Sequence, residues 1–353
     1  MKIGILTHHY INNFGAFLQV YSLREAIAKL FPNDDVYVID CMNYKHFIIN
    51  TCGWFRFYKD KENLSIWLQK IQLLKTFSKA RKKYLKMTTR CTTSQQINKL
   101  KLDCIIVGSD EVWNYKDKKS FAPQKYGIGL NVDKLIAYAP SMGQTTGEDA
   151  SEEILQGIKS FSAVSARDDL TEKFTEKIRK EKICRVTDPT FLTDIPEEEV
   201  SGIVRPYILF YYCDGLPDEE KDKIIMYAKK NGMDIYGAGE TDKRYTKSTV
   251  NLTPFQWVWM FRNAEGIITG TFHGAVFSML SHRKFACYLT NPSRIKKVGS
   301  LLKEYDLGNR QCEGKAELLI EKINTPINYE TIQKKFEKRK NESLLFLRNT
   351  ILK

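Results

Sequence analysis

The sequence predicts an α/β protein built from two tandem Rossmann-like domains. Short apolar runs alternate with longer amphipathic segments, and this alternation occurs twice. An acidic, proline-bounded stretch at residues 194–206 separates the two sets. The 353 residues are enough for two domains that each bury a core. We therefore predict an N-terminal domain over 1–195 and a C-terminal domain over 196–328.

The first domain begins with a strand, a helix and a second strand, as doubly wound sheets do. These elements are expected over 2–7, about 15–30 and 36–40. Residues 44–100 then interrupt the alternation with an aromatic-rich and afterwards strongly basic stretch. Its segment "KIQLLKTFSKARKKYLKMTTR" has no acidic residue. We interpret 44–100 as a helical insertion with a basic face.

Regular alternation returns after the insertion, and helices of this length between strands indicate a parallel sheet. The expected strands of the first domain are 102–108, 135–140, 162–168 and 183–189, with helices from about Glu152 and Leu170.

The second domain repeats the pattern. Its expected strands are 207–212, 233–237, 266–269 and 285–289, and its expected helices are 218–230, 254–263 and 274–280. The tail at 329–353 is expected to form one long, basic, amphipathic helix, in which Phe336, Leu344, Leu345 and Leu347 are available for packing.

The composition narrows the class of protein. With 42% hydrophobic and 27% charged residues, extensive disorder is not expected. No run approaches the roughly 20 apolar residues of a membrane span, and the N-terminus becomes polar too early for a signal peptide, so we expect a cytoplasmic protein. The eight cysteines form no CxxC pair and no cluster at zinc-ligand spacing, so no metal site is expected.

The net charge of +13 has three candidate causes: nucleic acid, an anionic membrane surface or an acidic small substrate. Nucleic acid is disfavoured because no recognition module and no interleaved basic and aromatic strand pattern occur. The P-loop, the GxGxxG fingerprint after the first strand, HExxH and GxSxG are absent too.

In open α/β sheets ligands bind beyond the carboxyl ends of the strands, and two such domains in tandem imply a cleft between them. In "THHYINNFGAFLQ" (7–19), Asn12, Asn13 and Gly15 stand at a helix start, which favours a bound anion, although an asparagine there is also an ordinary helix cap. His8 and His9 are weaker candidates.

Three further loops follow strands of the first domain. In "VGSDEVWN", Ser109 and Asp110 are expected at the ligand, and Trp113 either stacks on a sugar or is buried beneath a capped helix. Ser141 in "YAPSMG" either binds ligand or makes a turn. Arg167 in "VSARDD" either grips a carboxylate or phosphate or pairs with a neighbouring aspartate.

The fifth loop is "TGTFHGAVFSML" (269–280). His273 follows an apolar strand and begins a helix, so its imidazole is expected to enter the cleft and to serve as general acid or base. Its neighbours Thr271 and Gly274 are expected to contact ligand.

Taken in order, these motifs resemble the polysaccharide pyruvyl transferase family, over nearly the whole chain except the insertion and the tail. The matching segments are "NNFGAFLQVYSLREAI", "GSDEVWN", "APSMG", "SARDD", "TDPTFL", "NAEGIITGTFHGAVFSML" and "NPSRIKKVGSLLKEYDL". The resemblance implies the two-domain architecture of type B glycosyltransferases. It also implies transfer of pyruvate from phosphoenolpyruvate to sugar hydroxyls of an exopolysaccharide or cell-wall glycan precursor, with no other cofactor.

The resemblance implies roles for individual residues. His273 would be the general acid or base, and Arg167 would hold the donor's carboxylate or phosphate. Asn13, Gly15, Ser109 and Asp110 would line the acceptor side.

Two positions depart from the family pattern. Thr271 stands where some branches carry an arginine, and Arg294, Lys297 or Arg262 would replace that charge. Glu111 stands where glutamine is usual.

Three functions are therefore compared: a pyruvyl transferase, a nucleotide-sugar-dependent glycosyltransferase of the same architecture, and a non-catalytic subunit of a glycan-assembly complex. For a pyruvyl transferase, the excess of basic over acidic residues suits an anionic donor and a lipid-linked acceptor. The basic insertion is then expected either to rest on the anionic inner face of the plasma membrane or to be an ordinary solvated helix face.

Overall fold

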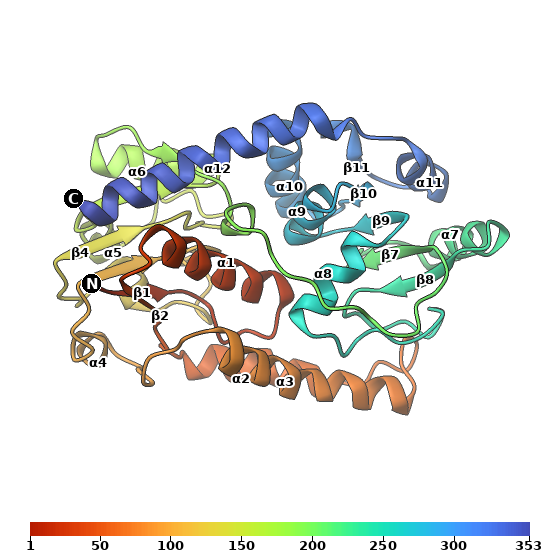
Figure 1. Ribbon diagram of the computed structural model, residues 1–353, viewed down its shortest axis with the longest axis horizontal. Coiled ribbons are helices and arrows are strands. Elements are labelled where there is room, and N and C mark those ends of the chain that lie inside the picture. Colours follow the sequence, from red (N-terminus) through yellow and green to blue (C-terminus); the bar gives the residue numbers. More distant parts are fainter. The chain divides into compact units, whose positions relative to one another are not determined.

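The computed structural model describes residues 1–353 apart from the side chain of Ser293. The chain forms two compact units that each contain a parallel β-sheet with helices packed on it (Figure 1). The first unit comprises Met1–Gly53, Lys79–Asp194 and Phe336–Lys353, and the second comprises Trp54–Ser78 and Ile195–Lys335. Two parallel sheets in this arrangement give the predicted α/β class with two Rossmann-like units.

The first unit has a six-stranded sheet in the order β2-β1-β3-β4-β5-β6. The strands are β1 (Lys2–Leu6), β2 (Asp35–Val38), β3 (Cys104–Val107), β4 (Lys134–Ala137), β5 (Ala163–Ala166) and β6 (Cys184–Arg185). Strand β1 pairs with both β2 and β3, through Ile3↔Val36 and Ile3↔Cys104. Because the chain passes from β1 to β2 on one side and returns with β3 on the other, the carboxyl ends of β1 and β3 form the switch point where ligands bind in such sheets.

The helices of the first unit begin where side chains satisfy free backbone N–H groups. Asn13, Ser151 and Asp168 each accept a hydrogen bond at the start of a helix. The helical elements of this part of the chain are α1 (Phe14–Leu30), α2 (Tyr44–Cys52), α4 (Ser94–Asn98), the 3-10 turn η2 (Pro123–Tyr126), α5 (Glu152–Lys159), α6 (Asp169–Arg179) and the 3-10 turn η3 (Pro189–Phe191). The strand expected over 183–189 pairs only at 184–185, because Asp188 and Pro189 turn into η3.

The second unit has a five-stranded sheet in the order β11-β10-β9-β7-β8. Its elements are β7 (Tyr207–Tyr211), α7 (Asp218–Lys230), β8 (Asp234–Gly237), α8 (Pro254–Arg262), β9 (Gly266–Thr269), α9 (Phe272–Leu280), β10 (Lys284–Tyr288), α10 (Pro292–Glu304), the 3-10 turn η4 (Gly308–Arg310), β11 (Gln311–Cys312) and α11 (Ala316–Asn324). Here the switch point lies between β7 and β9, since β8 pairs with one side of β7 and β9 with the other.

The insertion forms helices, as expected, but it is divided between the units. Helix α3 (Leu64–Tyr84) and the 3-10 turn η1 (Gly53–Phe55) lie in it, and the segment Trp54–Ser78 groups with the second unit. Lys75, Lys79, Lys82 and Lys83 are exposed along α3. Lys70 is instead buried and forms an ion pair with Glu62, with 2.5 Å between Nζ and Oε1.

The tail is one helix, α12 (Tyr329–Leu352), as the sequence predicts. Its last residues, Phe336–Lys353, belong to the first unit, where Leu347 and Ile351 are fully buried in a core with Ile3 and Ile5. Leu345 was expected to pack, but it is 57% exposed, because it lies on the opposite face of α12 from Leu347.

Candidate functional site

The loops after β1 and β3 are joined at the switch point of the first unit. The Thr7 hydroxyl donates to the backbone oxygen of Ser109 (3.0 Å), and the Gln19 amide donates to the Thr7 hydroxyl (3.2 Å). Asp110 follows with a φ of 77°, which is unusual for a residue other than glycine. Such backbone conformations are concentrated at functional sites, which makes this turn a candidate site.

Arg167, at the carboxyl end of β5, links three of these loops. Its Nη1 donates to the Ser109 hydroxyl (3.1 Å) and to the Asp188 carboxylate, and its Nη2 donates to Asp110 Oδ1 (3.2 Å). Burial lowers the pKa of Arg167, and the carboxylates of Asp188 and Asp110 outweigh this, so the net pKa is raised. The guanidinium is therefore held charged between two carboxylates.

This arrangement changes what Arg167 is suited to do. The sequence predicts either a grip on an anionic donor or an ion pair with the adjacent Asp168 or Asp169. The partners seen are Asp188 and Asp110, which the sequence did not indicate. Asp168 caps α6 instead. Two nearby carboxylates disfavour a further anion at Arg167, and the geometry is that of a group that positions Asp110.

The three candidate residues around the start of α1 differ in their exposure and in their hydrogen bonds. Asn13 is exposed and its Oδ1 accepts from the Ala16 backbone N–H (3.0 Å), so it caps the helix. Asn12 is buried and accepts from Arg81 Nη1 (3.0 Å), while Gly15 is buried within α1. Of these three candidates, Asn13 has the side chain most accessible to a ligand.

Trp113 lies in the core of the first unit. It is fully buried, its indole N–H donates to the Lys125 backbone oxygen (2.7 Å), and its ring packs against Tyr126 and Phe161. This corrects the expectation of a sugar platform. The reason is that the chain between β3 and β4 folds back over the indole, which a sequence pattern does not reveal.

Ser141 likewise serves the turn after β4. It is 1% exposed, and its hydroxyl accepts from the Gly143 backbone N–H (3.2 Å). The structure thus favours turn chemistry over ligand contact for Ser141.

The two histidines after β1 are buried and engaged. His9 Nε2 lies 3.0 Å from Asp40 Oδ1. Burial raises the pKa of Asp40, but the hydrogen bond and charge of His9, with Arg90, lower it further, so its net pKa is lowered. His8 Nδ1 lies 2.7 Å from Lys125 Nζ, a contact with no signal in the sequence because the two residues are 117 positions apart.

In the second unit, the turn from β9 to α9 is tight. A Cβ on Gly270 would lie 2.4 Å from the Tyr212 backbone oxygen, so only glycine fits there. Thr271 caps α9 by accepting from the Gly274 backbone N–H (3.0 Å). His273 is the second residue of α9 and is partly exposed.

Two cations lie beside this turn. Arg294 donates through Nη1 to the Gly270 backbone oxygen (3.2 Å) and through Nη2 to Asp214 (2.7 Å). Lys297 Nζ lies 5.0 Å from the centre of the Phe272 ring. With the positive end of α9, these groups suit an anion near His273.

Arg262 is placed elsewhere. It ends α8, which precedes β9, and it donates to the Ile195 backbone oxygen (2.8 Å). It therefore lies toward the amino end of β9, so it cannot replace the arginine that Thr271 displaces.

Metal chemistry has no evident site in the described part of the chain. No three or more His, Cys, Asp or Glu side chains there are grouped so that they could hold a metal ion. No helix among the described residues is both long and apolar enough to cross a membrane.

Comparison with known proteins agrees with this architecture. The family model described as polysaccharide pyruvyl transferase matches residues 13–292. Among curated proteins, none matches the sequence significantly.

Solved structures of similar architecture include UGT89C1 of Arabidopsis thaliana. That likeness has 9% identity and a TM-score of 0.51, over 99% of this chain and 99% of the other. Another is the ADP-heptose lipopolysaccharide heptosyltransferase II of E. coli, with 11% identity and a TM-score of 0.43, over 98% of this chain and 99% of that one. The fold is that of the GT-B glycosyltransferases.

Proposed function

Since the chain belongs to the polysaccharide pyruvyl transferase family, we propose that it transfers a pyruvyl group from phosphoenolpyruvate to a glycan. The acceptor is a pair of hydroxyls on a sugar of an exopolysaccharide, capsule or cell-surface glycan precursor, and the product is a pyruvate ketal. The observation that carries the proposal is the family match over 13–292, which includes the turns after β3 and β9.

The chemistry requires one proton donor and one anion site. An acceptor hydroxyl oxygen bonds to C2 of phosphoenolpyruvate while its proton passes to a base, and the methylene carbon takes up a proton. The bond from C2 to the phosphate oxygen then breaks, and a second hydroxyl oxygen bonds to C2 while its proton passes to the released inorganic phosphate, which closes the ketal. We assign the proton transfer to His273, whose imidazole is suited to both donation and acceptance near neutral pH.

We assign the donor's negative charge to the second unit. The start of α9 offers backbone N–H groups and its positive dipole end, and Arg294 and Lys297 stand beside the turn. This places the charge stabilisation next to His273 and not at Arg167, which already has two carboxylate partners. With these groups present, the anion site does not require an arginine at the position of Thr271.

We assign the acceptor to the first unit. Asp110 is partly exposed and held by Arg167, so its carboxylate is oriented to accept a proton from a sugar hydroxyl. Ser109 shares the same arginine, and Asn13 is exposed at the neighbouring helix start. Arg167 is on this view a positioning residue.

The experiment that tests the donor is thermal unfolding with phosphoenolpyruvate, which needs no known acceptor. A ligand at about 100 times its Kd stabilises the folded state by about 2.7 kcal/mol. We expect a rise in Tm with phosphoenolpyruvate that Arg294→Met reduces. Lys303→Met, at the far end of α10, is the matched control and should leave the rise intact.

A nucleotide-sugar-dependent glycosyltransferase is the second candidate, and the GT-B fold is the observation that favours it. Stabilisation by a nucleoside diphosphate, without any by phosphoenolpyruvate, would decide for this candidate. Absence of stabilisation by either, together with no transferase activity, would favour a non-catalytic subunit.

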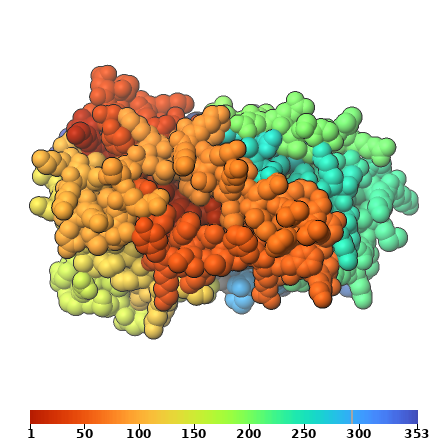
Figure 2. All heavy atoms as spheres, turned by 90° about the horizontal axis from the view of Figure 1, so that it is seen from below, coloured from red at the N-terminus to blue at the C-terminus, as the bar shows by residue number. Residues whose placement is uncertain are grey.

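We further propose peripheral contact with the anionic inner face of the plasma membrane. Within Trp54–Ser78 the apolar side chains of Phe55, Phe57, Leu64 and Leu68 are 44–66% exposed. Exposed basic residues lie among them, at Arg56, Lys59 and Lys61. Figure 2 shows atoms of this segment, in orange, at the surface. Exposed aromatic and basic side chains in one segment are typical of proteins that bind anionic lipid interfaces.

A further inference from the structure

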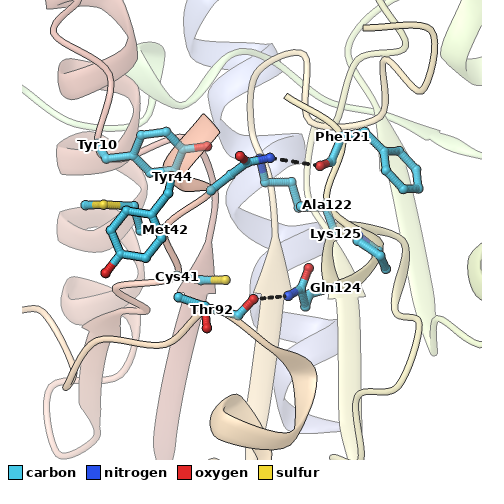
Figure 3. Close-up of a pocket in the computed structure, with 11 residues that line it drawn as sticks. Tyr10, Cys41, Met42, Tyr44, Thr92, Phe121, Ala122, Gln124 and Lys125 are labelled. Carbon is cyan, nitrogen blue, oxygen red and sulfur yellow. Dashed lines mark hydrogen bonds between the residues drawn. The ribbon is translucent and has the colours of Figure 1, made fainter. Parts of the chain in front are cut away.

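A pocket lies in the first unit, beside the loops that follow β1 and β2. It is a cavity of about 270 Å³ between the chain that follows β2 and the η2 turn. Figure 3 shows Tyr10, Cys41 and Thr92 on one side and Gln124 and Lys125 on the other. Ligand pockets for drug-sized molecules begin at roughly 300 Å³, so this cavity fits a ligand of about one sugar ring.

Lys125 is the first unusual feature of the pocket. It is only 2% exposed, and its amine contacts His8 Nδ1 at 2.7 Å. No carboxylate of the described residues lies within 4.0 Å of Lys125 Nζ, whereas Lys70, the other buried lysine, is paired with Glu62. A buried ammonium group is ordinarily neutralised by an ion pair with a carboxylate. Lys125 has no such carboxylate partner among the described residues.

Gln124 is the second unusual feature. Its residue is 7% exposed, and its amide nitrogen donates to the Thr92 backbone oxygen (2.9 Å), as the dashed line in Figure 3 shows. Its Oε1 is buried and accepts no hydrogen bond. A buried acceptor in a cavity wall is costly unless a donor reaches it, and a ligand hydroxyl would be such a donor.

The surrounding titratable groups do not supply an anion. Burial raises the pKa of the Cys41 thiol to about 11, so it stays neutral. Burial, followed by the charge of Lys125, lowers the pKa of both His8 and His46. Asp110 and Asp117 act on Lys125 only from beyond ion-pair distance, and burial dominates, lowering its pKa to about 7.

We propose that this pocket binds the anionic group of a small hydroxylated ligand, an acidic sugar or a sugar phosphate, with Lys125 holding the anion and Gln124 accepting from a hydroxyl. Carboxylate and phosphate share the chemistry that Lys125 recognises. That this ligand is part of the glycan acceptor rests on the proposed function, whereas its binding does not.

Direct calorimetric binding of three probes tests the proposal on the full chain without any donor. Glucuronate carries a carboxylate, glucose 6-phosphate carries a phosphate, and glucose is the uncharged control. We expect at least one of the two anions to bind and glucose to bind at least tenfold more weakly. Whichever anion binds more tightly identifies the source of the charge.

Two variants remove the anion site by different routes. Lys125→Met deletes the charge and keeps the apolar stem. Gln124→Glu keeps the shape of the pocket but adds the carboxylate that Lys125 lacks. Both should weaken anion binding roughly 10- to 100-fold, as expected for a charge-assisted hydrogen bond. Circular dichroism checks that each variant is folded. If Lys125→Met does not fold, the affinity of Gln124→Glu for the anions tests the proposal by itself.

The pH dependence provides an independent readout with glucuronate, whose carboxylate stays ionised throughout. An anion binds the protonated amine, so affinity should fall as pH rises through about 7, by roughly tenfold per pH unit above it. Equal binding of glucose and the anions, or anion binding that both variants leave intact, would overturn the proposal. Stabilisation by phosphoenolpyruvate should survive in both variants, which separates this result from failure of the proposed transferase.

Discussion

Arg167 shows how one side chain can order several loops. Its guanidinium reaches Ser109 and Asp110 after β3 and Asp188 after β6, while Arg167 itself follows β5 of the same sheet. Asp188 is 3% exposed and also accepts from the Thr190 backbone N–H (3.1 Å), so it is a buried charge that depends on its partners. Removing one member of such a group leaves the others buried and unpaired.

We predict that Arg167→Met lowers the free energy of unfolding by about 3–5 kcal/mol, because Asp188 would lose its buried partner. Arg185→Met is the matched control. Arg185 pairs with Asp169 and Glu172, whose side chains are 64% and 29% exposed, and such pairs contribute about 0–1 kcal/mol. Urea unfolding of the two variants measures both values. Losses of similar size would show that the Arg167 cluster is no more than a surface ion pair.

At the scale of elements, α12 is a helix whose end packs in the core of the first unit, although most of that unit lies far earlier in the sequence. Leu347 and Ile351 pack in the same core as Ile3, Ile5 and Ile136. The Ser343 hydroxyl, on the same helix, accepts from the Thr187 backbone N–H (3.0 Å). The first unit is therefore completed by the last residues of the chain.

Two neighbouring leucines of α12 test this packing. Leu347 is fully buried, so Leu347→Ala should lower the free energy of unfolding by about 2–5 kcal/mol through the lost contacts and the cavity left behind. Leu345 is 57% exposed, and Leu345→Ala should change stability by less than about 0.5 kcal/mol. Chemical unfolding followed by tryptophan fluorescence compares them. If both changes had the same small effect, α12 would not be part of the core.

At the scale of the whole molecule, the two sheets share one design. In each sheet, the first strand of the unit pairs with the second strand on one side and with the third on the other. The candidate residues follow the strands at that switch point. The net charge of +13 also belongs to this scale. The exposed lysines of α3 and the basic residues around Phe57 together form one positively charged segment. Such a segment is attracted to anionic surfaces at low ionic strength.

We predict that the protein floats with vesicles containing anionic lipid and not with neutral vesicles. Replacing Phe55, Phe57 and Leu64 together by serine should reduce flotation, because the exposed apolar side chains supply the insertion. Val204→Ser and Met226→Ser form the control, since these residues are 90% and 69% exposed elsewhere in the second unit. Flotation that the triple variant leaves unchanged would rule out this segment as the contact.

Most of the secondary structure followed from hydrophobic periodicity, because it depends on local spacing. The strands near Lys2–Leu6 and Gly266–Thr269 and the helix at Asp218–Lys230 were predicted within about one residue. The turn at Thr271–Gly274 was also predictable, since a cap and glycines have a local signature. The family resemblance, confirmed by the match over 13–292, depended on the order of such local motifs.

The tertiary structure alone decided which side chains meet. The sequence left Trp113 either as a sugar platform or as a buried side chain, and it is buried because the η2 segment covers it. Arg167 finds Asp188 and not its neighbour Asp168, and Lys125 reaches His8 across more than a hundred residues. Contacts of this kind are set by the packing of distant segments, which composition and spacing do not encode. The sequence by itself determined the order of the elements and the turns at the strand ends, and the fold determined the charge environment of the groups placed there.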